Sequence, residues 1–293
     1  MTRSLLYSTM LAACAAAAGI TLHAGQDTDE RRLWDSEFLQ KRPPARTPAP
    51  ARKAPTYRRA TPKPAAADEK APGEMLGVTI WKLRRPTASD NADARLLLLE
   101  EAGTATEEWT PERVESQTAF ASGDRVRLTI ESPRNGYLYV FDREQYADGS
   151  TSDPYLIFPT QRVRGGDNAV GAGKVVELPD KRAFVLKPMR SDYRGELLTV
   201  IVAGTPLTEV TIGPTLQKFD PAVVERWERD WGAAAERFEM AGGAGKTYTR
   251  EEKQAAAAGQ VLTQADELPQ TLFRVAARPE SPLLVAVPLK IAP

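Results

Sequence analysis

Arg125-Val126-Arg127-Leu128-Thr129-Ile130 is the stretch that decides the fold class, because charged or polar residues alternate in it with apolar ones. A period of two places its valine, leucine and isoleucine on one face of a β-strand. Gly136–Phe141 follows with the same period, so that its tyrosines and phenylalanine share one face while its leucine and valine share the other. The intervening Pro133-Arg134-Asn135-Gly136 contains Asn-Gly, which favours a hairpin, and we predict that it joins the two strands directly.

Short apolar runs of this kind recur along the middle of the chain. Turns rich in glycine separate them, for example at Asp148-Gly149 and at Gly171-Ala172-Gly173. Further strands are predicted at Leu76–Leu83, Arg95–Leu99, Tyr155–Phe158, Lys174–Leu178, Arg182–Lys187 and Glu196–Ala203. Many short strands between such turns are typical of a mainly β domain, an antiparallel β-sandwich or barrel, which we place at residues 75–207.

The C-terminal segment, residues 208–293, has a different pattern. Asp220-Pro221 is a typical helix start, and apolar residues then recur at three- and four-residue spacing. This predicts an amphipathic helix of about five turns that ends at Gly242-Gly243, with Trp227 and Trp231 packed against the sheet. Two further elements are predicted after it: a helix at Thr249–Ala258 and a terminal hairpin formed by Thr271–Arg278 and Leu283–Ile291.

The first 24 residues resemble a secretory signal peptide. Arg3 precedes an uncharged run from Ser4 to Leu22, and Ala24 supplies a small residue for cleavage. A second interpretation is that Leu11-Ala12-Ala13-Cys14 is a lipobox, in which case Cys14 is lipidated. A third is a retained anchor, since ~17–25 apolar residues can span a bilayer. All three interpretations predict that the rest of the chain is exported, either periplasmic or extracellular.

The chain contains one histidine, His23, and one cysteine, Cys14, and both lie in this leader. Cleavage after Ala24 removes both of them. A Ser-His-Asp triad, a Cys-His pair, a disulfide and a zinc site with His and Cys ligands are then excluded. A mature chain without cysteine suits an oxidising compartment. We expect no cofactor, and any catalysis would have to rest on carboxylates, lysine or tyrosine.

Two segments separate the leader from the β domain. Residues 25–40 have mixed charge and are expected to dock on the main domain through Trp34, the alternative being a separate partner-binding motif. Lys41–Pro64 then holds seven prolines, eight basic residues and no acid, so residues 41–74 are predicted to be a disordered, proline-rich tether. The body, residues 65–293, carries 28 basic and 34 acidic residues. The basic tether is expected to act as a spacer, to bind an anionic surface, or to fold back on this acidic body.

An acidic stretch that follows the second of the two opening strands is the strongest candidate for a binding site. Asp142, Glu144, Asp148 and Asp153 are predicted to lie on one loop, where their carboxylates are suitable ligands for calcium. Their spacing is not that of a helix–loop–helix calcium site, and the alternative is a solvated loop with a turn at its glycine. A pair of acids at a suitable separation is also what a carboxylate-based hydrolase requires.

Four stretches carry a resemblance to a known family: LGVTIWKLR at Leu76–Arg84, EWTPERV at Glu108–Val114, GDRVRLTIESPRNGYLYVFDREQYADG at Gly123–Gly149 and PYLIFPTQRVRGGDN at Pro154–Asn168. Over residues 76–207 the chain resembles the bacterial domain of unknown function 4384 (DUF 4384). Members of that family are often exported, or lie beside caspase-like or kinase modules in larger chains. The resemblance therefore implies an accessory or sensing module, and it implies no catalytic residues.

The observations together predict an exported, non-enzymatic interaction or structural module. It is expected to be tethered near the cell envelope and to bind a protein or glycan partner. Nucleic acid is not an expected partner, because the formal net charge is zero and the chain is exported. Two alternatives stay open, a carboxylate-based hydrolase of envelope polysaccharide and a calcium-stabilised adhesin.

Overall fold

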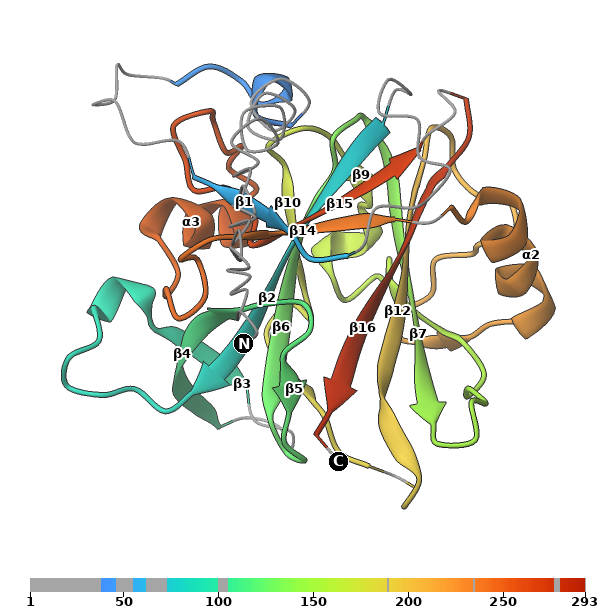
Figure 1. Ribbon diagram of the computed structural model, residues 1–293, viewed down its shortest axis with the longest axis horizontal. Coiled ribbons are helices and arrows are strands. Elements are labelled where there is room, and N and C mark those ends of the chain that lie inside the picture. The colour runs from blue at the N-terminus through green and yellow to red at the C-terminus, as the bar shows by residue number, and fades with distance from the viewer. Residues whose placement is uncertain are drawn as a thin grey trace, which may run out of the picture.

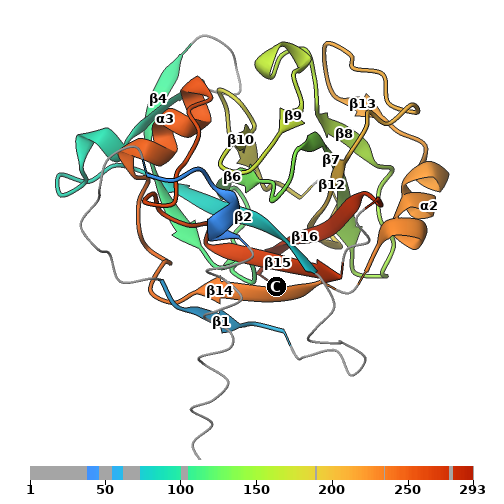
Figure 2. The same cartoon turned by 90° about the horizontal axis from the view of Figure 1, so that it is seen from above.

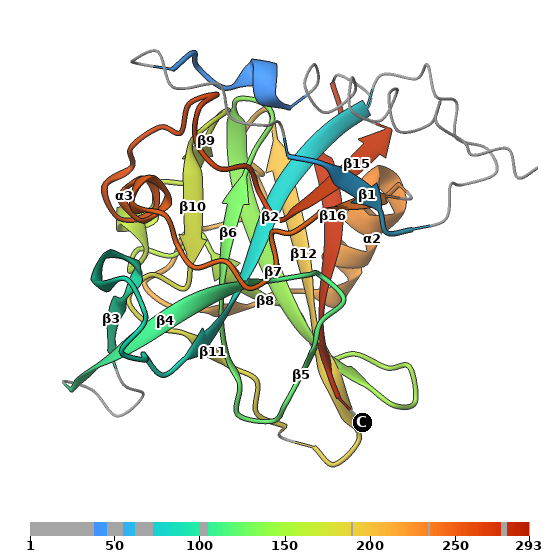
Figure 3. The same cartoon turned by 60° about the vertical axis from the view of Figure 1, so that its left-hand side comes forward.

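The computed structural model describes residues 38–45, 55–61, 73–99, 105–188, 190–233, 235–276 and 280–292. Within them the chain folds into two β-sheets that pack face to face (Figures 1 and 3). The prediction of a mainly β fold with largely antiparallel sheets is confirmed, and the architecture is an open sandwich rather than a closed barrel. Neither α-helix in the described part of the chain is long and apolar enough to cross a membrane.

The first sheet is organised around the long strand β2 (Gly73–Arg84). One edge of β2 pairs with β6 (Arg125–Glu131), and its other edge is shared by β15 (Thr271–Ala276) and β4 (Thr106–Val114). The remaining strands of this sheet are β1 (Tyr57–Arg59), β14 (Glu236–Met240), β3 (Leu96–Leu99), β10 (Val175–Leu178) and β11 (Phe184–Val185).

The second sheet is built on the long antiparallel pair β7 (Gly136–Tyr146) and β12 (Tyr193–Ala203). It continues beyond β12 with β16 (Leu283–Ile291) and beyond β7 with β8 (Tyr155–Phe158). Its short strands are β5 (Ala119–Phe120), β9 (Ala169–Val170) and β13 (Gln217–Lys218). Figure 2 shows β14, β15 and β2 in one layer and β7, β12 and β8 in the other.

The core lies between the two sheets and is filled by every second residue of their strands. Ile130 of β6 and Val140 of β7 belong to the same buried cluster. Phe141, the next residue on β7, faces the opposite side of the second sheet, where it contacts the ring of Trp227 with a centroid distance of 5.6 Å. The alternation predicted for both opening strands is therefore confirmed.

The predicted hairpin between these two strands is wrong, because β6 and β7 belong to different sheets. A tight Asn-Gly hairpin turn needs positive φ at both residues, and neither Asn135 nor Gly136 has it. The chain instead crosses from one layer to the other and places two apolar strand faces opposite each other. Gly136 serves close packing, since a Cβ there would lie 2.5 Å from the Ala203 carbonyl oxygen.

The predicted terminal hairpin is wrong for the same reason. Its two strands exist as β15 and β16, but β15 pairs with β2 in the first sheet and β16 pairs with β12 in the second. Each strand therefore packs its apolar residues against the opposite sheet and does not pair with the strand that is its neighbour in sequence. Residues 208–293 therefore contribute strands to both sheets, β14 and β15 to the first and β16 to the second.

The helix α2 (Pro221–Trp231) lies against the outer face of the second sheet (Figure 1). Asp220 caps it as predicted, because its carboxylate accepts a hydrogen bond from the Ala222 amide at 2.9 Å. The five-turn length is wrong, since the helix ends at Trp231 and residues 236–240 form β14. Strand pairing of β14 with both β1 and β15 outweighs the helical spacing of its apolar residues.

The second helix, α3 (Arg250–Ala258), has the predicted position and packs beside the first sheet. Thr249 and Glu252 form a reciprocal capping box at its start. The preceding Tyr248 stacks on Trp81 of β2 with a ring-centroid distance of 4.0 Å. The described residues also form three short 3-10 helices, which are η1 (Leu39–Lys41), η2 (Ala92–Ala94) and η3 (Arg164–Gly166).

Part of the predicted disordered tether belongs to the folded body. Residues 38–45, which we call the N-terminal strap, bury Phe38 and Arg42 to 2% exposure, and β1 pairs with β14. Arg58 forms an ion pair with Glu115 at 2.6 Å. The tether prediction is therefore wrong for residues 41–45 and 55–61, where burial and ion pairing hold the basic segment on the acidic body. Cys14, His23 and Trp34 lie outside the described residues.

Candidate functional site

Two of the predicted site residues, Asp142 and Glu144, lie on a strand and not on a loop. They follow Val140 along the inner face of β7, toward the end at which β7 finishes and β12 begins. The register of the β7–β12 pair places Glu196 directly opposite Glu144 and diagonally across from Asp142. The fold thus brings three carboxyl groups together, and we call Asp142, Glu144 and Glu196 the carboxyl cluster.

Two tyrosines hold the edges of the carboxyl cluster. The Tyr146 hydroxyl donates a hydrogen bond to Glu144 Oε2 at 2.7 Å, and the Tyr193 hydroxyl donates one to Glu196 Oε1 at 2.5 Å. Asp142 Oδ1 and Glu196 Oε2 are shielded from solvent and receive no hydrogen bond from an amide, guanidinium or hydroxyl donor of the described residues. The two carboxyl groups interact electrostatically, so that the charge on Glu196 raises the pKa of Asp142.

The cluster differs from the fully buried acids of the described chain in having no basic partner. Each of the four fully buried glutamates has an arginine beside it: the pairs are Glu131–Arg42, Glu236–Arg59, Glu239–Arg237 and Glu252–Arg113. Two arginines close to the cluster form their ion pairs with acids outside it. Arg143 points to the other face of β7 and pairs with Glu228 of α2, while Arg190 pairs with Asp192 at 2.8 Å.

Burial and mutual repulsion favour the protonated form of Asp142 and Glu196. Burial raises the pKa of Asp142 well above the usual aspartate range, and the charges of Glu196 and Glu144 raise it further. Burial also raises the pKa of Glu196. Glu144 and Glu196 lie opposite each other on neighbouring strands and Asp142 lies diagonally, so the three carboxylates repel, and a proton shared by Asp142 and Glu196 relieves the repulsion. The cluster can therefore exchange a proton, or exchange that proton for a cationic group.

The other two predicted site residues lie apart from the cluster. Asp148 sits in the predicted turn, where its Oδ1 accepts hydrogen bonds from the Ser150 amide at 2.9 Å and hydroxyl at 2.6 Å; these lower its pKa. Asp153 forms an ion pair with Lys218 at 2.6 Å. The prediction of four acids on one calcium-binding loop is thus wrong in its geometry. In the described part of the chain, no set of three or more His, Cys, Asp or Glu residues is arranged to hold a metal ion.

Glu196, Tyr146 and Tyr193 were not identified from the sequence. Their part in the site depends on the register between β7 and β12, and β12 lies some fifty residues further along the chain. The alternation of β7 does contain a usable signal. Asp142 and Glu144 occupy the same alternating positions as Leu138 and Val140, which predicts that their side chains continue an inward-facing row.

Comparisons with protein-family models, with curated proteins and with solved structures found no significant match. The resemblance to DUF 4384 over residues 76–207 accordingly stays a prediction that rests on the sequence stretches quoted above.

Proposed function

We propose that this protein is an exported, non-catalytic interaction module that binds a protein partner near the cell envelope. The observation that carries the proposal is the carboxyl cluster, two acids on the inward-facing row of β7 and one on the adjacent strand β12, with no ion-pair partner among the described residues. A buried carboxylate without a partner is costly, and elsewhere in this protein an arginine offsets that cost. A lysine or arginine side chain of a bound protein supplies the missing positive charge and displaces the shared proton.

The position of the cluster supports a role in binding. It lies at the end of the sandwich where β7 finishes at Tyr146 and β12 begins at Tyr193, whereas the N-terminal strap lies at the opposite end (Figures 1 and 3). In an exported protein held at its N-terminal side, through Cys14 or through the basic segment, this arrangement presents the cluster away from the attachment.

The experiment uses isosteric amides. The full chain and its D142N/E144Q/E196Q variant are used to retain proteins from an envelope extract, with D148N/D153N as the matched control, because those acids lie outside the cluster. The proposal expects one protein band that wild type and control retain and the triple variant loses, with binding that weakens as salt is added. A band that the triple variant retains equally, or retention of polysaccharide alone, contradicts it.

Localisation needs a separate test. Deleting Lys41–Pro64 would also remove Arg42 and β1 from the folded body, so loss of envelope association would not isolate the role of charge. Replacing Arg46, Arg52, Lys53 and Lys63 by glutamine changes only bases outside the described residues. If the basic segment binds an anionic surface, this variant leaves the envelope fraction while its melting temperature is unchanged. Unchanged fractionation rejects the surface-binding role.

A carboxylate-based hydrolase of envelope polysaccharide is the second candidate, and the raised pKa of Asp142 beside Glu196 favours it. Such a pair offers a proton donor next to an ionisable acid, as acid–base hydrolysis requires. Retaining glycosidases place their two carboxyl groups ~5–5.5 Å apart and inverting ones ~6.5–9.5 Å apart. Release of soluble sugars from purified envelope polysaccharide by wild type but not by D142N would establish this activity in place of the binding role.

A further inference from the structure

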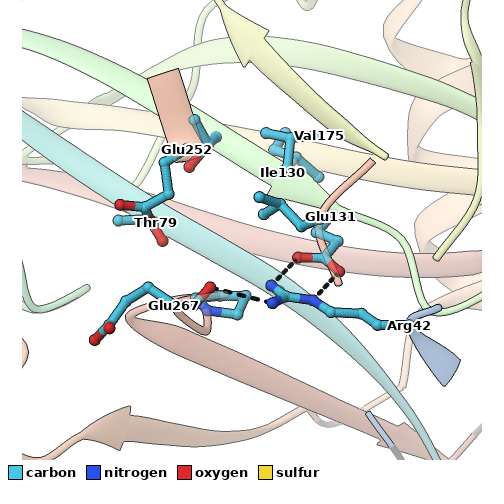
Figure 4. A pocket seen from close by; sticks show the side chains of 11 residues that line it. Arg42, Thr79, Ile130, Glu131, Val175, Glu252 and Glu267 are labelled. Carbon is cyan, nitrogen blue, oxygen red and sulfur yellow. Dashed lines mark hydrogen bonds and ion pairs between the residues drawn. The ribbon is translucent and has the colours of Figure 1, made fainter. Parts of the chain in front are cut away.

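The most complete recognition geometry in the protein surrounds Arg42 of the N-terminal strap. Its guanidinium makes two hydrogen bonds to Glu131, at 2.7 and 2.6 Å, in the bidentate arrangement that arginine forms with a carboxylate. The carbonyl oxygens of Thr263, Asp266 and Glu267 accept further bonds at 3.2–3.3 Å. Figure 4 shows this guanidinium lying between Glu131 and the backbone near Glu267. We call these acceptors the arginine slot.

The slot is assembled by the body of the protein and not by the strap. Glu131 is the last residue of β6, and its Oε1 also accepts a hydrogen bond from the Gly173 amide at 3.1 Å. The loop that supplies the carbonyls is held by Asp266, whose Oδ2 accepts hydrogen bonds from the Thr263 amide at 2.6 Å and hydroxyl at 2.8 Å. A cavity of about 20 Å³, enough for a single water molecule, adjoins Arg42 and Glu131.

The strap is bound in the way that a short peptide is bound. Phe38 enters a separate apolar cluster with Met75 and Leu272, and its ring lies next to Gly77, where a Cβ would approach it to 2.9 Å. The carbonyl oxygens of Arg42 and Pro43 accept hydrogen bonds from Gln264 at 3.0 and 2.9 Å. Two side-chain anchors and two backbone acceptors are thus the contacts that fix residues 38–45.

We infer that the arginine slot is a recognition site for a segment with an aromatic residue four positions before an Arg-Pro pair, filled here by the chain's own strap and open in trans to the strap of a second copy. The slot demands arginine, because a planar guanidinium can bond a carboxylate in bidentate fashion and reach carbonyls with its remaining donors, whereas an ammonium cannot. An empty slot leaves Glu131 buried without a counter-charge, which gives the site its affinity for a replacement.

The first test removes the anchor and restores it from outside. Full-length R42A is titrated with guanidinium chloride, with sodium chloride as ionic-strength control, and with the peptide FLQKRPPA, which has the sequence of residues 38–45. We expect a saturable rise of several degrees in the melting temperature of R42A. The peptides FLQKAPPA and ALQKRPPA should give a smaller rise or none, and wild type, whose slot is filled, should not respond. If R42A does not fold, R42K is used in the same way.

The second test pairs two defective copies. R42A has an open slot and E131Q has an unpaired strap arginine, so mixing the two should yield a heterodimer on gel filtration that neither variant forms alone. Peptide rescue together with the heterodimer supports the inference in full. Peptide rescue without a heterodimer overturns exchange between copies. A folded R42A that responds to neither guanidinium nor peptide overturns the recognition site itself.

Discussion

Asp142 and Glu196 lie diagonally across the β7–β12 pair, and neither carboxyl group has an ion-pair partner among the described residues. The sequence has one histidine, His23, which lies outside the described residues. Burial raises the pKa of Asp142 and of Glu196, so the pH dependence of stability reports on the carboxyl cluster.

We predict that stability falls as the pH rises above the ordinary carboxyl range, about 4. The folded-state pKa of Asp142 is raised above its unfolded value, so the native state binds more protons than the unfolded state within that window, and ionisation at higher pH favours unfolding. D142N should flatten this decline in melting temperature. Each unit by which the pKa is raised corresponds to about 1.4 kcal/mol. D148N, at an exposed turn, should leave the slope unchanged, and a D142N slope equal to that of wild type would reject the shared proton.

The calcium-stabilised adhesin can be tested by melting. Asp148 accepts hydrogen bonds from Ser150, and Asp153 forms an ion pair with Lys218. We therefore expect no change in melting temperature when millimolar calcium or a chelator is added. A rise with calcium that D142N abolishes would instead assign the ion to the carboxyl cluster, and a rise that D148N/D153N abolishes would restore the predicted loop site.

Trp227 should account for most of the attachment of α2 to the second sheet. Trp227 is 2% exposed and contacts both Phe141 and Phe219, whereas Trp231 is only partly buried. We expect W227A to lower the free energy of unfolding by about 3–5 kcal/mol, the usual cost of a large cavity. W231A should cost clearly less. Urea denaturation of the two variants measures the difference, and equal losses would show that the helix is held by other contacts.

A substitution at Gly136, where the chain enters the second sheet, tests how closely β7 and β12 approach each other. A Cβ on this residue would lie 2.5 Å from the carbonyl oxygen of Ala203, a backbone atom that cannot rotate away. G136A should therefore destabilise the protein by about 1–3 kcal/mol, as overpacking usually does. At Gly204 a Cβ would meet nothing within 4 Å, so G204A is the matched control and should be close to neutral. Similar melting temperatures for both variants would contradict the close approach of β7 and β12 described here.

Most strands could be predicted from the sequence because their two faces have different environments. The alternation of Val126–Ile130 and of Leu138–Val140 reports burial against the opposite layer, which is a local property of each strand. Which strands pair, in contrast, depends on residues that are far apart in the sequence. The Asn-Gly before β7 had the composition of a hairpin turn, yet the pairing of β6 with β2 and of β7 with β12 decided the path of the chain.

Only part of the candidate site could be predicted from the sequence, because one of its residues joins the others through strand pairing. Asp142 and Glu144 could be identified as an acidic pair, while Glu196 joins them only through the strand register. The N-terminal strap was missed because its composition, rich in proline and arginine, is typical of disorder. Two residues in it, Phe38 and Arg42, find buried partners that composition alone does not reveal.

The first sheet joins the two ends of the described chain, and this sets the order in which the protein can assemble. Tyr57 of β1 pairs opposite Met240 of β14, and the start of β2 pairs with β15. In a chain synthesised from its N-terminus, the start of β2 lacks its partner β15, and Arg42 lacks its carbonyl acceptors at residues 263–267, until the last quarter of the sequence has been made. The sandwich can therefore close only after nearly the whole chain has been synthesised.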